Sequence, residues 1–148
     1  MDWIILTERD LFDLLNKSQL DLLKAEAVKV NDSGICNRII DMVVSRIRAE
    51  IAASGVNMLD CNYAKIPPEL RETALRLALE ALQTRLPELE LSPAQIRAAD
   101  YAREILARVA EGKLPVSRPA NGIKTARKFA VEHGAGERKF TRKSTEGM

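Results

Sequence analysis

One amphipathic stretch, residues 33–54, constrains the fold of this chain more than any other. Its apolar residues recur at three- and four-residue steps, which is the period of one face of an α-helix. Ser33 can cap the start of this helix and Gly55 can end it. The apolar face consists of Cys36, Ile39, Ile40, Val43, Val44, Ile47 and Ile51. The opposite, solvent-facing side consists of Arg38, Asp41, Ser45 and Arg48. The pattern therefore predicts a long helix that packs one face against a core.

Two shorter helices are predicted before the long one. Thr7 and Asp10 have the spacing of a capping box, and leucines follow them. Ser18 can cap a second short helix, which ends near Val28. After the long helix, residues 56–66 have no period and are predicted to form a loop.

A helix over residues 68–86 is apolar around nearly half of its circumference. Pro67 and Pro68 favour its start, and Pro87 ends it. So wide an apolar surface exceeds what one packing partner covers. Either the helix is packed on two sides within a bundle, or its second stripe meets a neighbouring subunit. That second stripe consists of Leu75, Leu79, Leu82 and Leu86.

A third long helix is predicted to begin at Ser92, with Pro93 in its first turn and Gln95 completing a capping box. It runs to Glu111, and Gly112 ends it. Three arginines on its other side are predicted to form a solvated face rather than a nucleic-acid-binding face. They are Arg97, Arg103 and Arg108.

The fold class predicted is all-α: a small bundle of two short leading helices and three longer ones, with an extended basic C-terminal arm. Hydrophobic residues make up 46% of the chain and aromatics only 4%, a balance that favours helix packing. Residues 1–115 form the predicted helical body, with 15 Lys and Arg against 18 Asp and Glu. Residues 116–148 form the arm, which has eight Lys and Arg against three Asp and Glu, and few aliphatic residues.

The sequence contains little that catalysis or metal binding requires. His133 is the only histidine, and no Ser or Cys has a plausible neighbouring base. Cys36 and Cys61 are too few for a disulfide framework or a metal site. We therefore expect no enzyme activity, no metal and no cofactor, and predict a binding or structural protein. No apolar run is long enough for a membrane span or signal peptide, which predicts synthesis in the cytoplasm and no membrane partner.

The order of elements resembles the head-tail joining proteins of Mu-like phages, which are related to the head-tail adaptors of long-tailed phages. The resemblance covers about residues 3–115. It is carried by Thr7 with Asp10-Leu11, Asn31-Asp32-Ser33, the Arg46-Ile47-Arg48-Ala49-Glu50-Ile51 helix, the loop from Tyr63 to Pro67, Pro68-Glu69-Leu70, and Ala110-Glu111-Gly112-Lys113.

The resemblance implies a structural protein of the virion neck, at the head-tail junction. Such a protein forms a ring of about twelve copies beneath the portal protein and supports a tail-side stopper or terminator protein. Packaged DNA passes through the channel without sequence-specific contact. The arm is expected to bind the portal, and the second leucine stripe to contribute to packing within or between subunits. The portal-binding residues expected are Arg118, Lys124, Arg127, Lys128, Phe129, Arg138, Lys139 and Phe140.

A small nucleic-acid-binding protein is the alternative, with the arm contacting phosphates. The two leading helices have the outline of a helix-turn-helix, but Asp21 and Glu26 occupy the second one, where basic and amide side chains would be needed. The steep dependence of phosphate binding on salt would identify this function.

Overall fold

The computed structural model describes residues 2–29 and 34–123. Several predictions concern residues outside these ranges. They are the Ser33 cap and, within the arm, Lys124, Arg127, Lys128, Phe129, Arg138, Lys139 and Phe140. The described part of the chain is mostly helical, which confirms the all-α fold class, with two leading helices and three long ones.

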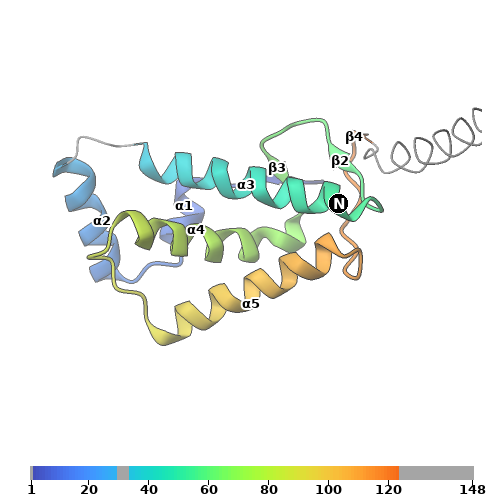
Figure 1. Ribbon diagram of the computed structural model, residues 1–148. Helices are drawn as coiled ribbons and strands as arrows, with labels where there is room; N and C mark the ends of the chain where they lie inside the picture. Colours follow the sequence, from blue (N-terminus) through green and yellow to red (C-terminus); the bar gives the residue numbers. More distant parts are fainter. Residues whose placement is uncertain (1, 30–33, 124–148) are drawn as a thin grey trace, which may run out of the picture.

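The three long helices form the body of the molecule. They are α3 (Ile35–Ser54), α4 (Arg71–Arg85) and α5 (Pro93–Ala110), and a short 3-10 turn, η1 (Pro68–Leu70), precedes α4. The leading helices are α1 (Glu8–Phe12) and α2 (Lys17–Lys29). In the view of Figure 1, α4 lies between α3 and α5, and α2 lies at one end of the bundle. Each of the three long helices contacts the other two. The central helix is therefore covered from two sides by the same chain.

The side-chain caps account for where the helices begin. Both predicted capping boxes are confirmed, Thr7 with Asp10 before α1 and Ser92 with Gln95 before α5. For α2 the predicted Ser18 cap is wrong. The Asn16 side chain instead accepts a hydrogen bond from the backbone N–H of Gln19 at 2.9 Å, and the Gln19 side chain accepts one from the N–H of Asn16 at 3.1 Å. This box lies two residues before the predicted cap.

The ends of α3 are explained by two glycines. The helix begins at Ile35, and Gly34 before it has no side chain to cap this end. Gly55 ends the helix as predicted, with a φ of 67° that favours glycine over other residues. Between these ends, every residue of the predicted apolar face is buried.

The second leucine stripe lies in the interior of a single subunit. Leu75, Leu79 and Leu82 are at most 1% exposed, and Leu86 packs partly buried against the same core. Because α3 and α5 cover α4 from either side, Leu75, Leu79 and Leu82 have no surface left for a neighbour. Of the two explanations for the wide apolar surface, packing within the bundle is therefore the one that holds for these residues.

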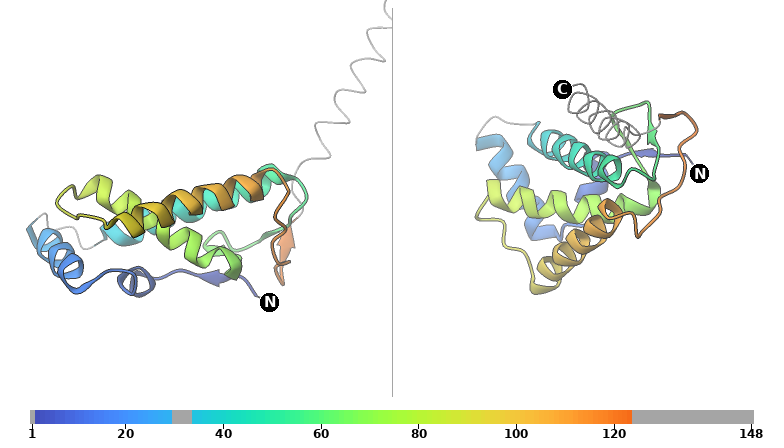
Figure 2. Two further views of the ribbon diagram at one scale, coloured as in Figure 1. Left: turned by 90° about the horizontal axis from the view of Figure 1, so that it is seen from below. Right: turned by 45° about the vertical axis from the view of Figure 1, so that its right-hand side comes forward.

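The segment predicted to be an irregular loop contains strands. β2 (Leu59–Asp60) pairs antiparallel with β4 (Gly122–Ile123), and β3 (Lys65–Ile66) pairs antiparallel with β1 (Ile4–Ile5). Figure 2 shows from two further sides that β1 and β4 lie at the end of the bundle opposite α2. Segments far apart in the sequence are thus joined at one end of the body.

Candidate interaction site at the strand junction

The two small sheets and their connections form what we call the strand junction: β1 with Trp3, residues 56–66, and residues 113–123. The described chain ends there, in β4, so the basic residues 124–148 follow the junction directly in the sequence. Its geometry therefore decides where those residues begin.

Arg48 lies at the centre of the junction and was wrongly predicted to face solvent. Its side chain and backbone together are only 7% exposed. One guanidinium nitrogen, Nη1, donates to the backbone oxygen of Lys65 at 2.7 Å, and Nη2 donates to that of Asp60 at 2.6 Å. The residue is buried because the chain after α3 folds back over this side of the helix.

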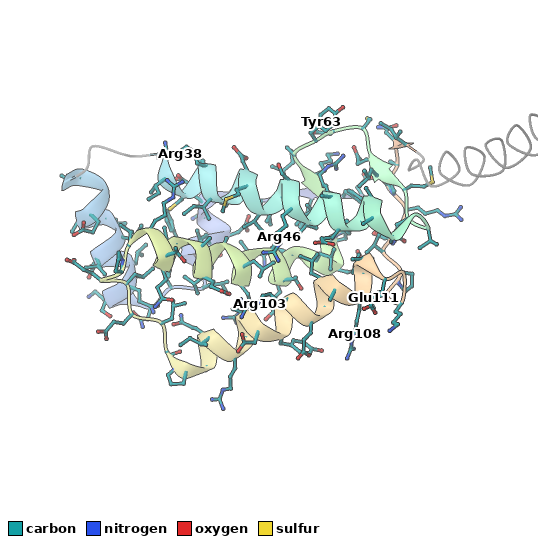
Figure 3. The ribbon with its side chains drawn as sticks, viewed as in Figure 1. Arg38, Arg46, Tyr63, Arg103, Arg108 and Glu111 are labelled. Atoms are coloured by element: carbon teal, nitrogen blue, oxygen red, sulfur yellow. The ribbon has the colours of Figure 1, made fainter. Side chains whose placement is uncertain are left out.

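Two aromatic rings flank the Arg48 guanidinium. Its central carbon lies 5.7 Å from the ring centroid of Trp3 and 5.7 Å from that of Tyr63, distances at which a cation is attracted to an aromatic face. Trp3 is buried, whereas Tyr63 is 83% exposed and stands at the outer edge of its loop in Figure 3. The arginine therefore connects the N-terminal strand, α3 and the loop in one cluster.

Burial lowers the pKa of Arg48, and the nearby Asp60 carboxylate opposes that change. An arginine stays protonated under such conditions, because its pKa is far above neutral. Asp60 is itself 3% exposed, and its carboxylate accepts a hydrogen bond from the backbone N–H of Asn62 at 2.8 Å. The junction thus contains a buried cation with a compensating carboxylate.

Residues 116–123, which the sequence analysis assigned to the arm, contact the helical body. The indole nitrogen of Trp3 donates to the backbone oxygen of Ser117 at 2.9 Å. The backbone N–H of Cys61 donates to the backbone oxygen of Asn121 at 2.8 Å. These bonds and the pairing of β2 with β4 hold the segment against the bundle. The body accordingly extends to Ile123.

Arg118 is the one predicted portal-binding residue within the described chain. It lies exposed on the segment that crosses the junction. Close to it in the sequence, β4 carries Ile123, which is 52% exposed. β1 carries Ile5, which is 53% exposed, and Tyr63 adds the most exposed aromatic ring of the junction. This end of the body therefore offers apolar side chains and a cation to a partner.

The described residues include nothing arranged for metal binding: no group of three or more His, Cys, Asp or Glu side chains among them could hold an ion. Cys36 is buried and Cys61 exposed, and no disulfide joins them. Within residues 2–29 and 34–123, no helix is long and apolar enough to cross a membrane.

Sequence reasoning missed Arg48 and Trp3, although one signal was present. Arg48 follows Val44 by four residues and precedes Ile51 by three, so it is in register with the apolar face of α3. Trp3 gave no comparable signal, because its indole partner lies 114 positions away in the chain.

Together these features define a small all-α protein whose helical body is closed at one end by two short antiparallel sheets. Comparison with protein-family models, with curated proteins and with solved structures finds no match.

Proposed function

We propose that this chain is a phage head-tail adaptor, a structural protein that joins the portal of the filled capsid to the tail. The proposal is supported by the order of elements that resembles the Mu-like joining proteins and by the all-α fold. One observation carries it furthest: a cationic segment starts from a fixed point at one end of an acidic helical body.

The charge distribution suits binding to an acidic partner at that end. Residues 124–148 hold seven Lys and Arg against three Asp and Glu, whereas residues 1–115 have an excess of acidic groups. Pairing of Ile123 with Leu59 fixes where this segment begins. An acidic portal surface would offer charges complementary to those of this segment.

Contacts between adaptor copies would use exposed side chains of α3 and α5. Met42 on α3 is 54% exposed, and Ile96 and Tyr101 on α5 are 47% and 58% exposed. A ring requires two different surfaces on each copy, so that the face of one copy meets another face of the next. We propose the outer sides of α3 and α5 for these two roles, in a ring of about twelve copies.

Deletion of residues 124–148 in the phage that encodes this chain tests the proposal. Ending the chain after Ile123 keeps the whole strand junction, so the body should remain folded, which circular dichroism of the purified protein would verify. We expect DNA-filled heads and free tails that do not join, visible by electron microscopy. Joined, infectious particles would overturn the assignment of this segment to the portal.

The nucleic-acid-binding alternative is favoured by the same cluster of cations and needs its own measurement. If about six of the basic residues contacted phosphates, affinity for DNA would fall about a thousandfold between 50 and 200 mM salt. A gel-shift titration of the full chain at both salt concentrations distinguishes the two functions. An adaptor should give no shift that depends on salt in this way.

A further inference from the structure

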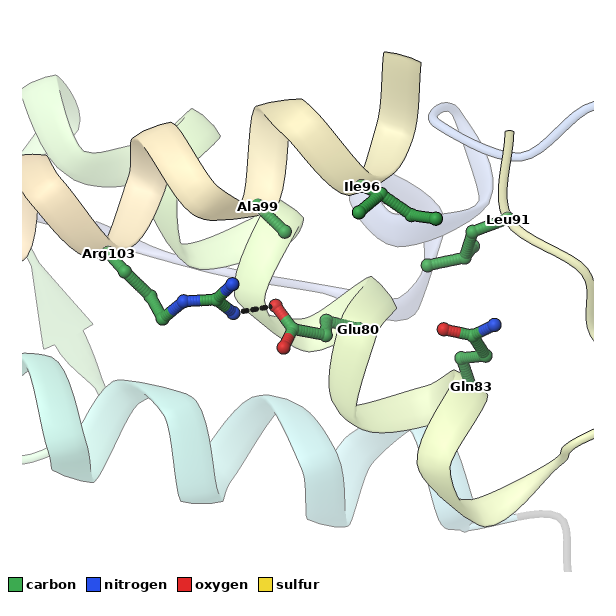
Figure 4. A pocket seen from close by; sticks show the side chains of 6 residues that line it. All are labelled: Glu80, Gln83, Leu91, Ile96, Ala99 and Arg103. Atoms are coloured by element: carbon green, nitrogen blue, oxygen red, sulfur yellow. Dashed lines mark hydrogen bonds and ion pairs between the residues drawn. The ribbon is translucent and has the colours of Figure 1, made fainter. Parts of the chain in front are cut away.

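A pocket opens between α4 and α5, away from the strand junction. Figure 4 shows its six lining side chains, with apolar groups on one side and polar groups on the other. They are Glu80, Gln83, Leu91, Ile96, Ala99 and Arg103. Its volume is about 160 Å³. A cavity of about 150 Å³ lined by aliphatic residues accommodates one benzene ring, so this pocket has room for one phenyl side chain.

The one cation that lines the pocket, Arg103, is paired with two carboxylates, of which Glu80 lines the pocket and Asp100 lies beside it. Arg103 donates to the carboxylate of Glu80 and also to that of Asp100. One guanidinium is thus shared by two carboxylates, and all three side chains are partly exposed. A further cation at the rim would balance the charge of the second carboxylate. Because the site is exposed, such a cation would gain only a modest interaction energy.

The sequence contains a matching pattern that the proposed function leaves unused. The triplet Arg-Lys-Phe occurs twice, at residues 127–129 and 138–140. Each triplet places a phenyl ring directly beside two cations, and no other Phe, Tyr or Trp follows Tyr101. A pocket with one apolar side, next to two carboxylates that share one cation, is complementary to such a triplet.

The length of the chain favours the second triplet. The pocket lies about eleven residues from the C-terminal end of α5, or roughly 16 Å along that helix, and the segment must also cross from β4 to α5. Phe129 is six positions beyond Ile123 in the chain, a span of at most about 20 Å, whereas Phe140 is seventeen positions beyond it, a span of up to about 56 Å. Only Phe140 reaches the pocket with slack.

We infer that the pocket between α4 and α5 binds Phe140 of the same molecule, with Arg138 and Lys139 against the carboxylates of Glu80 and Asp100. Docking there holds the C-terminal segment along the body while no other partner is bound. The inference goes beyond the proposed function, because it involves this chain alone and does not require a portal.

Methyl NMR spectra of the full-length protein test this docking. A phenyl ring in the pocket shifts the methyl resonances of Leu91, Ile96 and Ala99 through its ring current. Phe140→Ala should remove those shifts, since losing a buried phenyl ring lowers the docked population at least about tenfold. Phe129→Ala is the matched control and should leave the three resonances in place. Identical spectra for Phe140→Ala and the unaltered chain would overturn the inference.

A pair of rim substitutions tests the charge argument separately. Gln83→Lys adds a cation beside the pocket and should lower the docked population about two- to fivefold, whereas Gln83→Glu should maintain or raise it. Equal effects of the two substitutions would contradict the role of charge. If Gln83→Lys unfolds the chain, the comparison of Phe140→Ala with the unaltered chain still tests whether Phe140 occupies the pocket.

The ring-current shifts must also persist when the protein is diluted. Their loss at low concentration would show that the ring comes from a second copy, which would overturn docking within one molecule.

Discussion

The long helices and the strand junction are held together by different kinds of interaction. Between α3, α4 and α5 the buried contacts are mainly apolar, and side chains such as Ile47, Leu79 and Leu82 are fully buried. At the junction the contacts are polar and specific: Arg48 binds two backbone oxygens and Trp3 binds a third. Apolar burial is non-directional, whereas each of these hydrogen bonds requires one geometry.

This difference predicts two responses to substitution. Removing a core side chain should lower the stability of the whole bundle, because a cavity remains in densely packed surroundings. Removing a polar contact at the junction should cost less overall and should act mainly on the segments it connects. The following four substitutions test this contrast, from the largest expected effect to the smallest.

Leu79→Ala should lower the free energy of unfolding by about 3 kcal/mol, since Leu79 is 1% exposed at the centre of the bundle. Urea denaturation followed by circular dichroism measures the change. Thr84→Ala on the exposed side of the same helix is the control, with an expected change within about 0.5 kcal/mol. A loss below about 1 kcal/mol for Leu79→Ala would contradict the central position of α4.

Arg48→Met should lower the free energy of unfolding by about 2 kcal/mol, because two buried backbone oxygens lose a charged donor. Hydrogen exchange should accelerate in residues 59–66 more than in α4. Arg46→Met, two positions earlier on the exposed face of α3, is the matched control and should change stability by less than about 0.5 kcal/mol. Equal losses for both arginines would refute the special role of Arg48.

Trp3→Phe retains an aromatic ring beside Arg48 but removes the donor to Ser117, which should cost about 1 kcal/mol. The backbone N–H of Cys61, which donates to Asn121, should then exchange faster because residues 113–123 are held less firmly. Ser117→Ala is the control, since it keeps the backbone oxygen and loses only an exposed contact with Glu69. Unchanged exchange at Cys61 in Trp3→Phe would show that the indole bond does not hold this segment.

Asp10→Asn should have the smallest effect, and one that depends on pH. A hydrogen bond from Arg71 lowers the pKa of Asp10 from its ordinary value of 3.8. The folded state then binds the proton more weakly than the unfolded chain does. The resulting stabilisation is present above pH 3.8 and is lost as the pH falls through the lower folded-state pKa.

The size of this effect is limited because both side chains are partly exposed. We expect a stability difference between Asp10→Asn and the unaltered chain of less than about 1 kcal/mol near neutral pH, shrinking in acid. A double-mutant cycle with Arg71→Gln isolates the coupling between the two residues. A coupling energy that stays constant or grows in acid would contradict this direction of the pH dependence.

The helices were predictable because their signals are local. The apolar face of α3 repeats at the helical period, and the Ser92 and Gln95 box marks the start of α5 within four residues. The width of the apolar surface on α4 was also visible. Periodicity alone could not decide whether Leu79 faces another helix of the same chain or another subunit, because a buried surface has the same sequence pattern in both cases.

The junction was not predictable because its signals are distant and short. Strands of two residues have no measurable alternation, and the pairing of Leu59 with Ile123 joins positions far apart in the chain. A change in charge marked residue 115 as the end of the body, but charge carries no information about which backbone oxygen accepts a hydrogen bond. The burial of Arg48 likewise depends on a segment that folds over it later in the sequence.

The bond between Trp3 and Ser117 has a practical consequence for rearranging the gene. Because it brings Asp2 and Ile123 to the same end of the bundle, a short flexible linker could connect them. New termini could then be opened between α4 and α5, at the exposed Pro87 and Glu88. Such a circularly permuted chain would retain every helix, and its termini would lie at the end of the bundle opposite the strand junction.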